Sequence, residues 1–202
     1  MVTAVTTREA RAWEVASAVP DPELPMLTLA DLGVLAGIEV DAGEGDAGEG
    51  GEGDGGHGAG GAVTAWLTPT YSGCPAVAEM AADVDRRLRA AGYRDVRVRL
   101  RLDPPWSTDL ITAEGRRKLA EAGIAPPRPG AAAAAFAAAG PVPLALGPTR
   151  TAAGAASAAS AVTCPQCGAA DTEELSRFGS TACKALWRCR ACREPFERVK
   201  EI

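Results

Sequence analysis

Two closely spaced cysteine pairs constrain this chain more than any other feature of its sequence. Cys164 and Cys167 form one Cys-x-x-Cys pair, Cys189 and Cys192 form the other, and 21 residues lie between the pairs. Pairs at this spacing are typical of a tetrahedral site with four thiolate ligands. Zn²⁺ is the ion that such sites usually hold, although the ligands alone leave an iron centre or four free thiols open.

The segment that carries these cysteines is too short to fold readily by hydrophobic burial alone. It has 39 residues, from 164 to 202, and few large apolar side chains. Modules of this size usually need a metal or another cross-link to be stable. We therefore predict a small C-terminal zinc-ribbon-like β module over residues 164–202.

Two compositionally biased segments divide the rest of the chain. Residues 41–61 hold eleven glycines and six carboxylates but no Lys or Arg, which predicts a disordered loop insertion. An electrostatic role for these carboxylates is the alternative. Residues 126–163 hold six prolines, sixteen alanines and no acidic residue, which predicts an Ala/Pro-rich linker. The remaining residues, 1–125, are expected to form the first domain.

Hydrophobic periodicity predicts alternating helices and strands in this first domain. A helix is expected to begin at the capping pair Thr6 and Glu9 and to end before Pro20. The elements predicted after it are strands over 34–40 and 62–67, a helix over 75–91, a strand over 96–102 and a helix over 112–122. The order α-β-β-α-β-α indicates a two-layer α/β domain with one three-stranded sheet.

Composition and charge make several classes of protein improbable. The formal net charge is −5, so the chain as a whole has no electrostatic basis for binding nucleic acid or an anionic membrane. The longest apolar stretch, 131–146, is mostly alanine and is interrupted by glycine and proline, which argues against a membrane span. No apolar segment of a secretory signal follows Arg8 and Arg11. We therefore expect a cytoplasmic protein whose cysteines are ligands or reactive thiols rather than disulfides.

The charge of the ribbon bears on the partner that it would bind. Residues 164–202 carry seven Lys or Arg and six Asp or Glu, and a zinc ion with four thiolates would add about −2. Zinc ribbons that bind nucleic acid present a basic surface. A nearly neutral module favours docking to a protein, or simple stabilisation of the fold, over nucleic-acid binding.

Cys74 is the cysteine with the clearest chemical context outside the ribbon. It lies between a predicted strand and a predicted helix, and Pro75 suits the first helical position. Cys74 would then be the N-cap, where helix amides and the helix dipole lower a thiol pKa. A thiolate suits nucleophilic attack or soft-metal ligation, and a small buried residue at a strand–helix junction is the alternative. The single histidine, His57, falls in the glycine-rich loop, so a Cys–His dyad is not expected.

Two further features have both a functional and a structural interpretation. Cys183 lies between the ribbon pairs and next to Lys184, whose charge would favour a thiolate. It is therefore either an auxiliary thiol or a structural residue of the ribbon. Asp21 and Glu23 alternate with three prolines, which hold the two carboxylates on an extended segment. The alternative is that this segment only ends the preceding helix.

The order of several short motifs resembles the iron–sulfur assembly domain over residues 13–102. These motifs are Asp21-Pro-Glu-Leu-Pro, Asp31-Leu-Gly-Val, Leu67-Thr-Pro-Thr and Gly73-Cys-Pro. Residues 103–109 and 173–186, together with the ribbon, resemble more narrowly the PaaD-type accessory subunit of phenylacetyl-CoA 1,2-epoxidase systems. The two biased segments depart from the family pattern.

The resemblance implies an accessory subunit without its own catalysis in phenylacetate degradation. It implies maturation of an iron–sulfur or di-iron centre through Cys74, with Asp21 and Glu23 as helpers, and partners in the oxygenase and reductase components. One cysteine cannot hold a cluster, so a transient iron–sulfur cluster would need a second ligand from a second protomer of a homodimer, from Cys183 or from a small thiol. No phosphate loop, histidine–carboxylate cluster or nucleophile elbow is found in the sequence.

Two other classes of function remain open. One is a structural or regulatory oxygenase subunit whose ribbon is a docking module, and stoichiometric copurification would favour it. The other is a free-standing ribbon protein that binds nucleic acid, and the nearly neutral ribbon argues against it.

Overall fold

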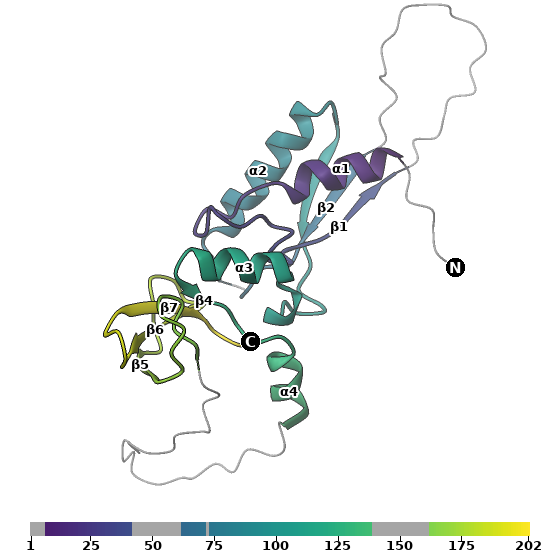
Figure 1. The fold of residues 1–202 in the computed structure, drawn as a ribbon. Helices are drawn as coiled ribbons and strands as arrows, with labels where there is room; N and C mark the ends of the chain where they lie inside the picture. Colours follow the sequence, from purple (N-terminus) through teal and green to yellow (C-terminus); the bar gives the residue numbers. More distant parts are fainter. Residues whose placement is uncertain (1–6, 42–61, 72, 139–161) are drawn as a thin grey trace, which may run out of the picture. The chain divides into compact units, whose positions relative to one another are not determined.

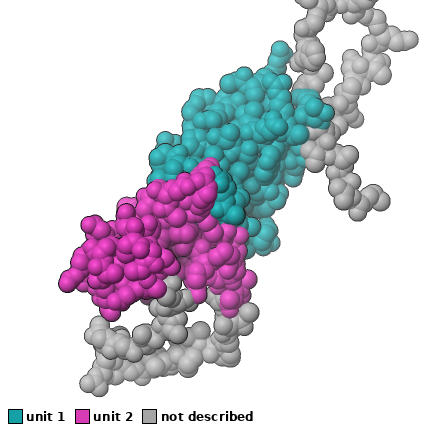
Figure 2. All heavy atoms as spheres, viewed as in Figure 1, with its two compact units in different colours: residues 1–106, 110–115 teal, residues 107–109, 116–202 magenta. Residues whose placement is uncertain are grey.

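The computed structural model describes residues 7–41, 62–71, 73–138 and 162–202. The capping residue Thr6, nearly all of the glycine-rich loop and most of the Ala/Pro-rich segment therefore lie outside the described residues. The chain forms two compact units (Figure 2), the first from residues 1–106 and 110–115 and the second from 107–109 and 116–202. This division falls earlier in the chain than the predicted boundary after residue 125, and the two-residue strand at 124–125 joins the sheet of the second unit.

The first unit contains the predicted three-stranded sheet. Its strands are β1 (Leu35–Val40), β2 (Val63–Leu67) and β3 (Val96–Leu100), with β2 in the centre. β1 pairs antiparallel with β2 as the predicted hairpin, and β3 pairs parallel with β2. The parallel pair needs a crossover connection, and the helix between β2 and β3 provides it.

Two helices form the second layer of this unit. α1 (Thr7–Ser17) packs against β1, α2 (Val77–Ala90) packs against β3, and the helices contact each other (Figure 1). The buried side chains of α2 are Met80, Val84 and Leu88, which lie four residues apart and therefore on one face of the helix. The predicted two-layer α/β arrangement is confirmed.

Apolar residues alternate with arginines over 96–102, a pattern that predicts a strand with one buried face, but β3 is less buried than this pattern predicts. Val96 is buried and Val98 is half-buried, but Leu100 and Leu102 are 50% and 59% exposed. β3 lies at the edge of the sheet, and an alternating pattern identifies the inner face of a strand without showing how far the covering layer extends along it.

A close approach of two loops fixes the start of α3 (Ala113–Glu121). The Thr112 hydroxyl oxygen accepts the amide of Gly115 at 2.9 Å, and the Thr112 amide donates to the carbonyl of Asp31 at 2.9 Å. A Cβ on Gly115 would lie 2.6 Å from that same carbonyl oxygen. Gly115 is therefore required here, because only glycine lets the helix approach so closely.

The second unit is built around a four-stranded sheet. Its strands are β4 (Ile124–Ala125), β5 (Thr172–Ser176), β6 (Lys184–Cys189) and β7 (Pro195–Val199), in the order β4-β7-β6-β5. β5, β6 and β7 are antiparallel, as expected for the predicted β module, while β4 adds to β7 in parallel. A short 3₁₀ turn, η1 (Thr108–Leu110), and a helix, α4 (Ala131–Ala138), complete the described elements.

The helix α4 lies in the segment predicted to be an Ala/Pro-rich linker. The prolines precede and follow this alanine run rather than interrupt it, and alanine has the highest helix propensity. A carboxylate oxygen of Asp109 accepts the amide of Ala133 at 3.0 Å, which satisfies one donor in the first turn.

The core of the second unit extends beyond the predicted ribbon. Its buried members are Ala125, Val162, Cys164, Ala185, Trp187, Cys189 and Phe196, and the first two precede residue 164. Leu175 and Phe178 belong to the few large apolar residues of the ribbon, yet they are 46% and 77% exposed. None of the helices described here is long and apolar enough to cross a membrane.

Candidate metal centre and candidate functional thiol

The two Cys-x-x-Cys turns have the same backbone geometry. In the first turn the amide of Gly168 donates to the carbonyl of Cys164 at 2.9 Å, and in the second the amide of Arg193 donates to the carbonyl of Cys189 at 3.0 Å. Gly168 and Arg193 both have positive φ values, 75° and 70°. Each turn therefore curls around its cysteines, and β6 ends directly in the second turn.

The sulfur atoms of the four cysteines come together at one point. All four lie within 4.8 Å of one another, with 3.8 Å between Cys164 and Cys192 and 3.6 Å between Cys167 and Cys189. Metal–sulfur bonds of about 2.3 Å place the ligands of a tetrahedral Zn²⁺ about 3.8 Å apart, whereas a disulfide needs about 2.05 Å. The donor set and its spacing therefore fit a four-thiolate metal site.

The thiols of this group influence one another's ionisation. The backbone amide of Cys192 donates to the sulfur of Cys189 at 3.5 Å, and this bond is the main cause that lowers the pKa of Cys189 to about 7. A backbone hydrogen bond from Glu194 acts to lower the pKa of Cys192, but burial and the three neighbouring thiols raise it to about 12. Four thiols this close ionise together only when a cation compensates their charge.

Cys183 does not join this group. Its sulfur lies 3.1 Å from the Thr181 hydroxyl oxygen, and the metal-binding group among the described residues contains only the other four ribbon cysteines. Lys184, which was expected to act on Cys183, pairs instead with a carboxylate. Cys183 lies in the turn before β6, and the buried Lys184 ammonium lies 2.8 Å from a carboxylate oxygen of Glu197.

Cys74 lies in the loop between β2 and α2 and is half-buried. Its amide donates to the carbonyl of Tyr71 at 3.2 Å, and its carbonyl accepts the amide of Val77 at 3.3 Å. The N-cap of α2 is Ala76, so the predicted capping position of Cys74 is wrong by two residues. Pro75 and Ala76 form a turn before the helix, and the thiol is thus set back from the first helical amides.

The carboxylate of Asp21 organises its own loop. It is buried, and one of its oxygens accepts the amides of Glu23 at 2.8 Å and Leu24 at 2.7 Å. The Asp21 amide donates to the carbonyl of Leu27 at 2.9 Å, which closes the turn. These bonds support the structural interpretation of Asp21, while Glu23 is half-buried beside it. Neither carboxylate belongs to a group of three or more prospective metal ligands among the described residues.

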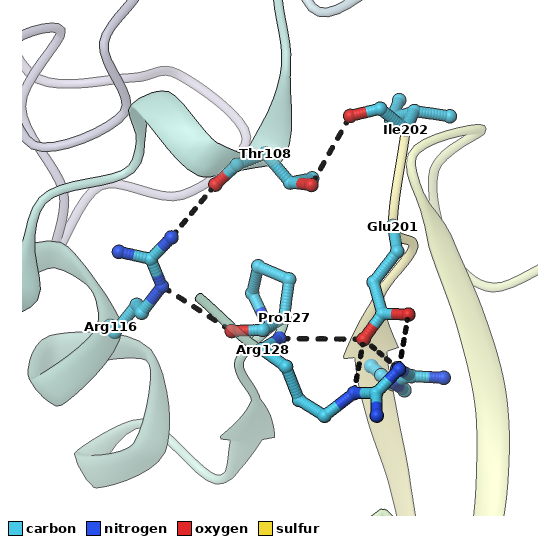
Figure 3. Close-up of polar contacts among 7 residues, drawn as sticks. Thr108, Arg116, Pro127, Arg128, Glu201 and Ile202 are labelled. Carbon is cyan, nitrogen blue, oxygen red and sulfur yellow. Dashed lines mark hydrogen bonds and ion pairs between the residues drawn. The ribbon is translucent and has the colours of Figure 1, made fainter. Parts of the chain in front are cut away.

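A polar network that the sequence did not indicate connects distant segments of the second unit. Glu201 accepts two bonds from the Arg128 guanidinium, at 3.1 and 3.2 Å (Figure 3). Arg116 donates to the carbonyl oxygens of Thr108 at 3.0 Å and Pro127 at 3.3 Å. These residues come from distant parts of the chain and have no common motif, so no local pattern could have identified them.

Comparison with known proteins identifies relatives of both parts of the chain. Residues 148–200 match the family model of the PaaD zinc beta ribbon domain. A protein of Escherichia coli K12 named as a subunit of 1,2-phenylacetyl-CoA epoxidase is 37% identical over 190 residues, which cover 94% of this chain and 91% of the relative.

Two solved structures are also similar. One is a domain of unknown function, DUF59, from Bacillus anthracis, with 21% identity, a TM-score of 0.43 and coverage of 55% of this chain and 90% of the other. The second is a conserved hypothetical protein of Thermotoga maritima, with 24% identity, a TM-score of 0.40 and coverage of 59% and 98%.

Proposed function

The chain belongs to the PaaD family of 1,2-phenylacetyl-CoA epoxidase subunits, and from this premise we propose that it is an accessory subunit of that epoxidase system in cytoplasmic phenylacetate catabolism. The observation that carries this proposal is the 37% identity over 94% of the chain, because similarity of this extent includes both units. The partners would be the oxygenase and reductase components. No catalysis of its own is assigned to the subunit.

The subunit's task in this proposal is the maturation of an iron–sulfur or di-iron centre through Cys74. Cys74 is half-buried in a loop rather than locked in the core, so an incoming cluster could reach its sulfur. The iron is cargo here, and a cluster needs more than one thiolate. The second ligand would come from a second protomer, from Cys183 or from a small thiol, with Asp21 and Glu23 as supporting carboxylates.

The ribbon in this proposal holds a structural Zn²⁺ with Cys164, Cys167, Cys189 and Cys192 as ligands. Structural zinc sites use four protein ligands and leave no open position. Two of these cysteines are buried and a third is half-buried, which suits a permanent site better than a site for exchange. The ribbon would then stabilise the second unit and leave cluster handling to Cys74.

A second candidate function is a structural or regulatory oxygenase subunit with the ribbon as its docking module. The exposure of Phe178 and Leu175, 77% and 46%, favours this alternative, since large apolar side chains on a surface often mark an interface. The two functions differ in stoichiometry. A maturation factor acts substoichiometrically, whereas a subunit of the oxygenase copurifies with it in equal amounts.

The test of the maturation role is Cys74→Ser in cells that depend on phenylacetate as carbon source, with Ser17→Ala, at another half-buried residue of the first unit, as the matched control. Serine replaces one atom of a half-buried side chain, so the fold should persist. We expect the Cys74→Ser cells to stop growing on phenylacetate and their epoxidase components to contain less iron. Growth and iron content at the wild-type level would show that Cys74 is a structural residue.

A further inference from the structure

A cleft of about 780 Å³ opens on the second unit, and none of the four cysteines of the candidate metal centre lines it. Residues of β5, β6 and β7 and of the segment that follows β5 line it. Its lining includes Glu174, Arg177, Phe178, Trp187, Arg198 and Lys200.

The strand register places the cleft on the face of the sheet that carries a metal ligand. Trp187 pairs with Glu174 on β5 and with Phe196 on β7, and Arg198 pairs with Ala185. Residues opposite one another in antiparallel strands share a face, and so do residues two apart along a strand. Cys189 is two residues from Trp187 on β6, so it lies on the same face of the sheet as the cleft. A ligand of the candidate metal centre and the cleft therefore share this face.

Two hydrogen-bond donors in the wall of this cleft have no acceptor among the described residues. They are the indole nitrogen of Trp187 and the Nε atom of Arg198. Trp187 is only 6% exposed, and the Arg198 guanidinium carbon lies 5.5 Å from the centroid of its ring. A buried donor without an acceptor destabilises the fold. Both groups can only donate, so a ligand that bonds to them must offer an acceptor.

The guanidinium of Arg198 is held in place before any ligand binds. Glu201 accepts a bond from Arg198 and further bonds from Arg128. Burial would raise the pKa of Glu201, but these two arginines lower it overall, so the carboxylate is charged at neutral pH. Because Glu201 engages the far end of the guanidinium, the Nε atom stays directed to another acceptor. Such preorganisation reduces the entropy that a ligand must lose on binding.

The outer wall of the cleft offers apolar and cationic contacts. Phe178 is 77% exposed, and the Lys200 ammonium lies 5.3 Å from the centroid of its ring. Arg177 is exposed. Exposed aromatic residues and arginines contribute most of the binding energy at protein interfaces. Beside them, β5 is the edge strand of the sheet, where an extended chain can bind.

From these observations we infer that the cleft binds an extended acidic segment of a partner protein. A carboxylate of this segment accepts hydrogen bonds from Trp187 and Arg198, and its apolar side chains pack on Phe178. A peptide fits better than a compact ligand, because the donors are buried while the apolar contact lies outside, next to an open strand edge. Glu174 at the rim limits the segment to a few carboxylates, since a fully acidic chain would be repelled there.

The test uses the full chain loaded with zinc and acetylated ten-residue peptides that tile the acidic segments of the oxygenase and reductase components. The choice of these probes rests on the proposed function. The readout is the ¹⁵N–¹H signal of the Trp187 indole, assigned with Trp187→Phe. We expect at least one peptide to shift this signal and to lose affinity at least tenfold when its carboxylates are changed to amides.

Variants of the cleft complete the test. Phe178→Ala and Arg177→Glu should each weaken binding of that peptide at least tenfold, while Leu102→Ala and Arg99→Glu, exposed residues of the first unit, should leave it unchanged. The inference is overturned if no peptide shifts the indole signal, or if the cleft variants bind the peptide as tightly as the wild type does. It is also overturned if coenzyme A displaces the peptide, since the cleft would then be a site for a small molecule. Cys74→Ser should not change the indole signal or its response to the peptide, because Cys74 does not line the cleft. Failure of the maturation proposal would therefore appear in the growth experiment, and failure of the cleft proposal in the peptide titration.

Discussion

Arg193 holds a backbone position that normally favours glycine. Its φ value of 70° matches the 75° of Gly168 at the equivalent place in the first cysteine turn. A side chain in this left-handed region costs roughly 1–2 kcal/mol, and the Arg193 side chain is exposed, so little packing offsets this cost. The turn needs the positive φ, because the Arg193 amide must reach the carbonyl of Cys189.

We therefore expect Arg193→Gly to raise the free energy of unfolding of the zinc-bound protein by about 1 kcal/mol. Gly168→Ala at the equivalent position should lower it by a similar amount. Urea unfolding of the two variants and the wild type, each with one equivalent of zinc, measures both changes. A loss of stability in Arg193→Gly would show that the arginine side chain has a role that offsets its backbone strain.

Lys184 and Glu197 form the most buried ion pair among the described residues of the second unit. The side chains are 5% and 24% exposed and 2.8 Å apart. Burial raises the pKa of Glu197, but Lys184 and Ser180 lower it overall. Glu197 also accepts the amide of Ser180 at 2.7 Å, so the pair holds the loop between β5 and β6 against β7.

Removing one partner of this pair should lower the free energy of unfolding more than removing both partners. Glu197→Gln leaves a buried ammonium without its counter-charge, and we expect it to lower the free energy of unfolding at pH 7 by about 2 kcal/mol, less than for a fully buried pair because Glu197 is partly exposed. Adding Lys184→Met should restore most of this loss. The exposed Glu194→Gln is the matched control and should change stability by less than about 0.5 kcal/mol. Equal stability of the single and double variants would contradict a buried charge as the cause.

At the scale of elements, the sequence predicts best where the hydrophobic pattern is long. α2 has fourteen residues, and the period of Met80, Val84 and Leu88 identifies both the helix and its buried face. Its start was predicted two residues too early, because Pro75 suits a turn before a helix as well as the first helical position. Local patterns thus identify an element more reliably than its ends.

Elements that depend on distant partners could not be predicted in this way. β4 has two residues, too few for any period, and it exists because β7 offers an open edge. α4 depends on alanine propensity and on Asp109, 24 residues earlier in the chain. The four ribbon cysteines were predicted because each turn brings two ligands together locally, whereas the donors of the cleft meet only through strand register.

Loss of any one of the four ribbon cysteines should remove the metal from the whole site. We expect one zinc ion per chain, and structural zinc contributes roughly 10–16 kcal/mol of apparent binding free energy. Cys189→Ser should therefore lose the metal and the slow amide exchange of β5, β6 and β7, while β1, β2 and β3 keep theirs. Metal analysis and hydrogen exchange measure both effects, with Cys183→Ser as the control that keeps its zinc. Full zinc occupancy in Cys189→Ser would contradict the assigned ligand set.

At the scale of the whole molecule, the second unit is assembled from separate stretches of the chain. The Thr108 amide donates to the carbonyl of Ile202 at 2.9 Å, and Arg128 binds Glu201 (Figure 3). β4 pairs with β7, and Ala125 is buried in the same core as Trp187. A module that begins at Cys164 therefore lacks part of its sheet, part of its core and the partners of its last residues.

Fragments of the chain should differ in stability because of this assembly. The fragment 107–202 contains every residue of the second unit, whereas 164–202 contains only the segment first predicted as the ribbon. Both should bind one zinc ion, because all four cysteines are present in each. We expect 107–202 to be more stable by about 2 kcal/mol or more, since it restores the burial of Ala125 and Val162 and the ion pair of Glu201. Urea unfolding of the two zinc-bound fragments measures the difference. Equal stability would show that the segments before residue 164 add nothing to the ribbon, and that the boundary expected from sequence describes the folding unit better than the division seen in the structure.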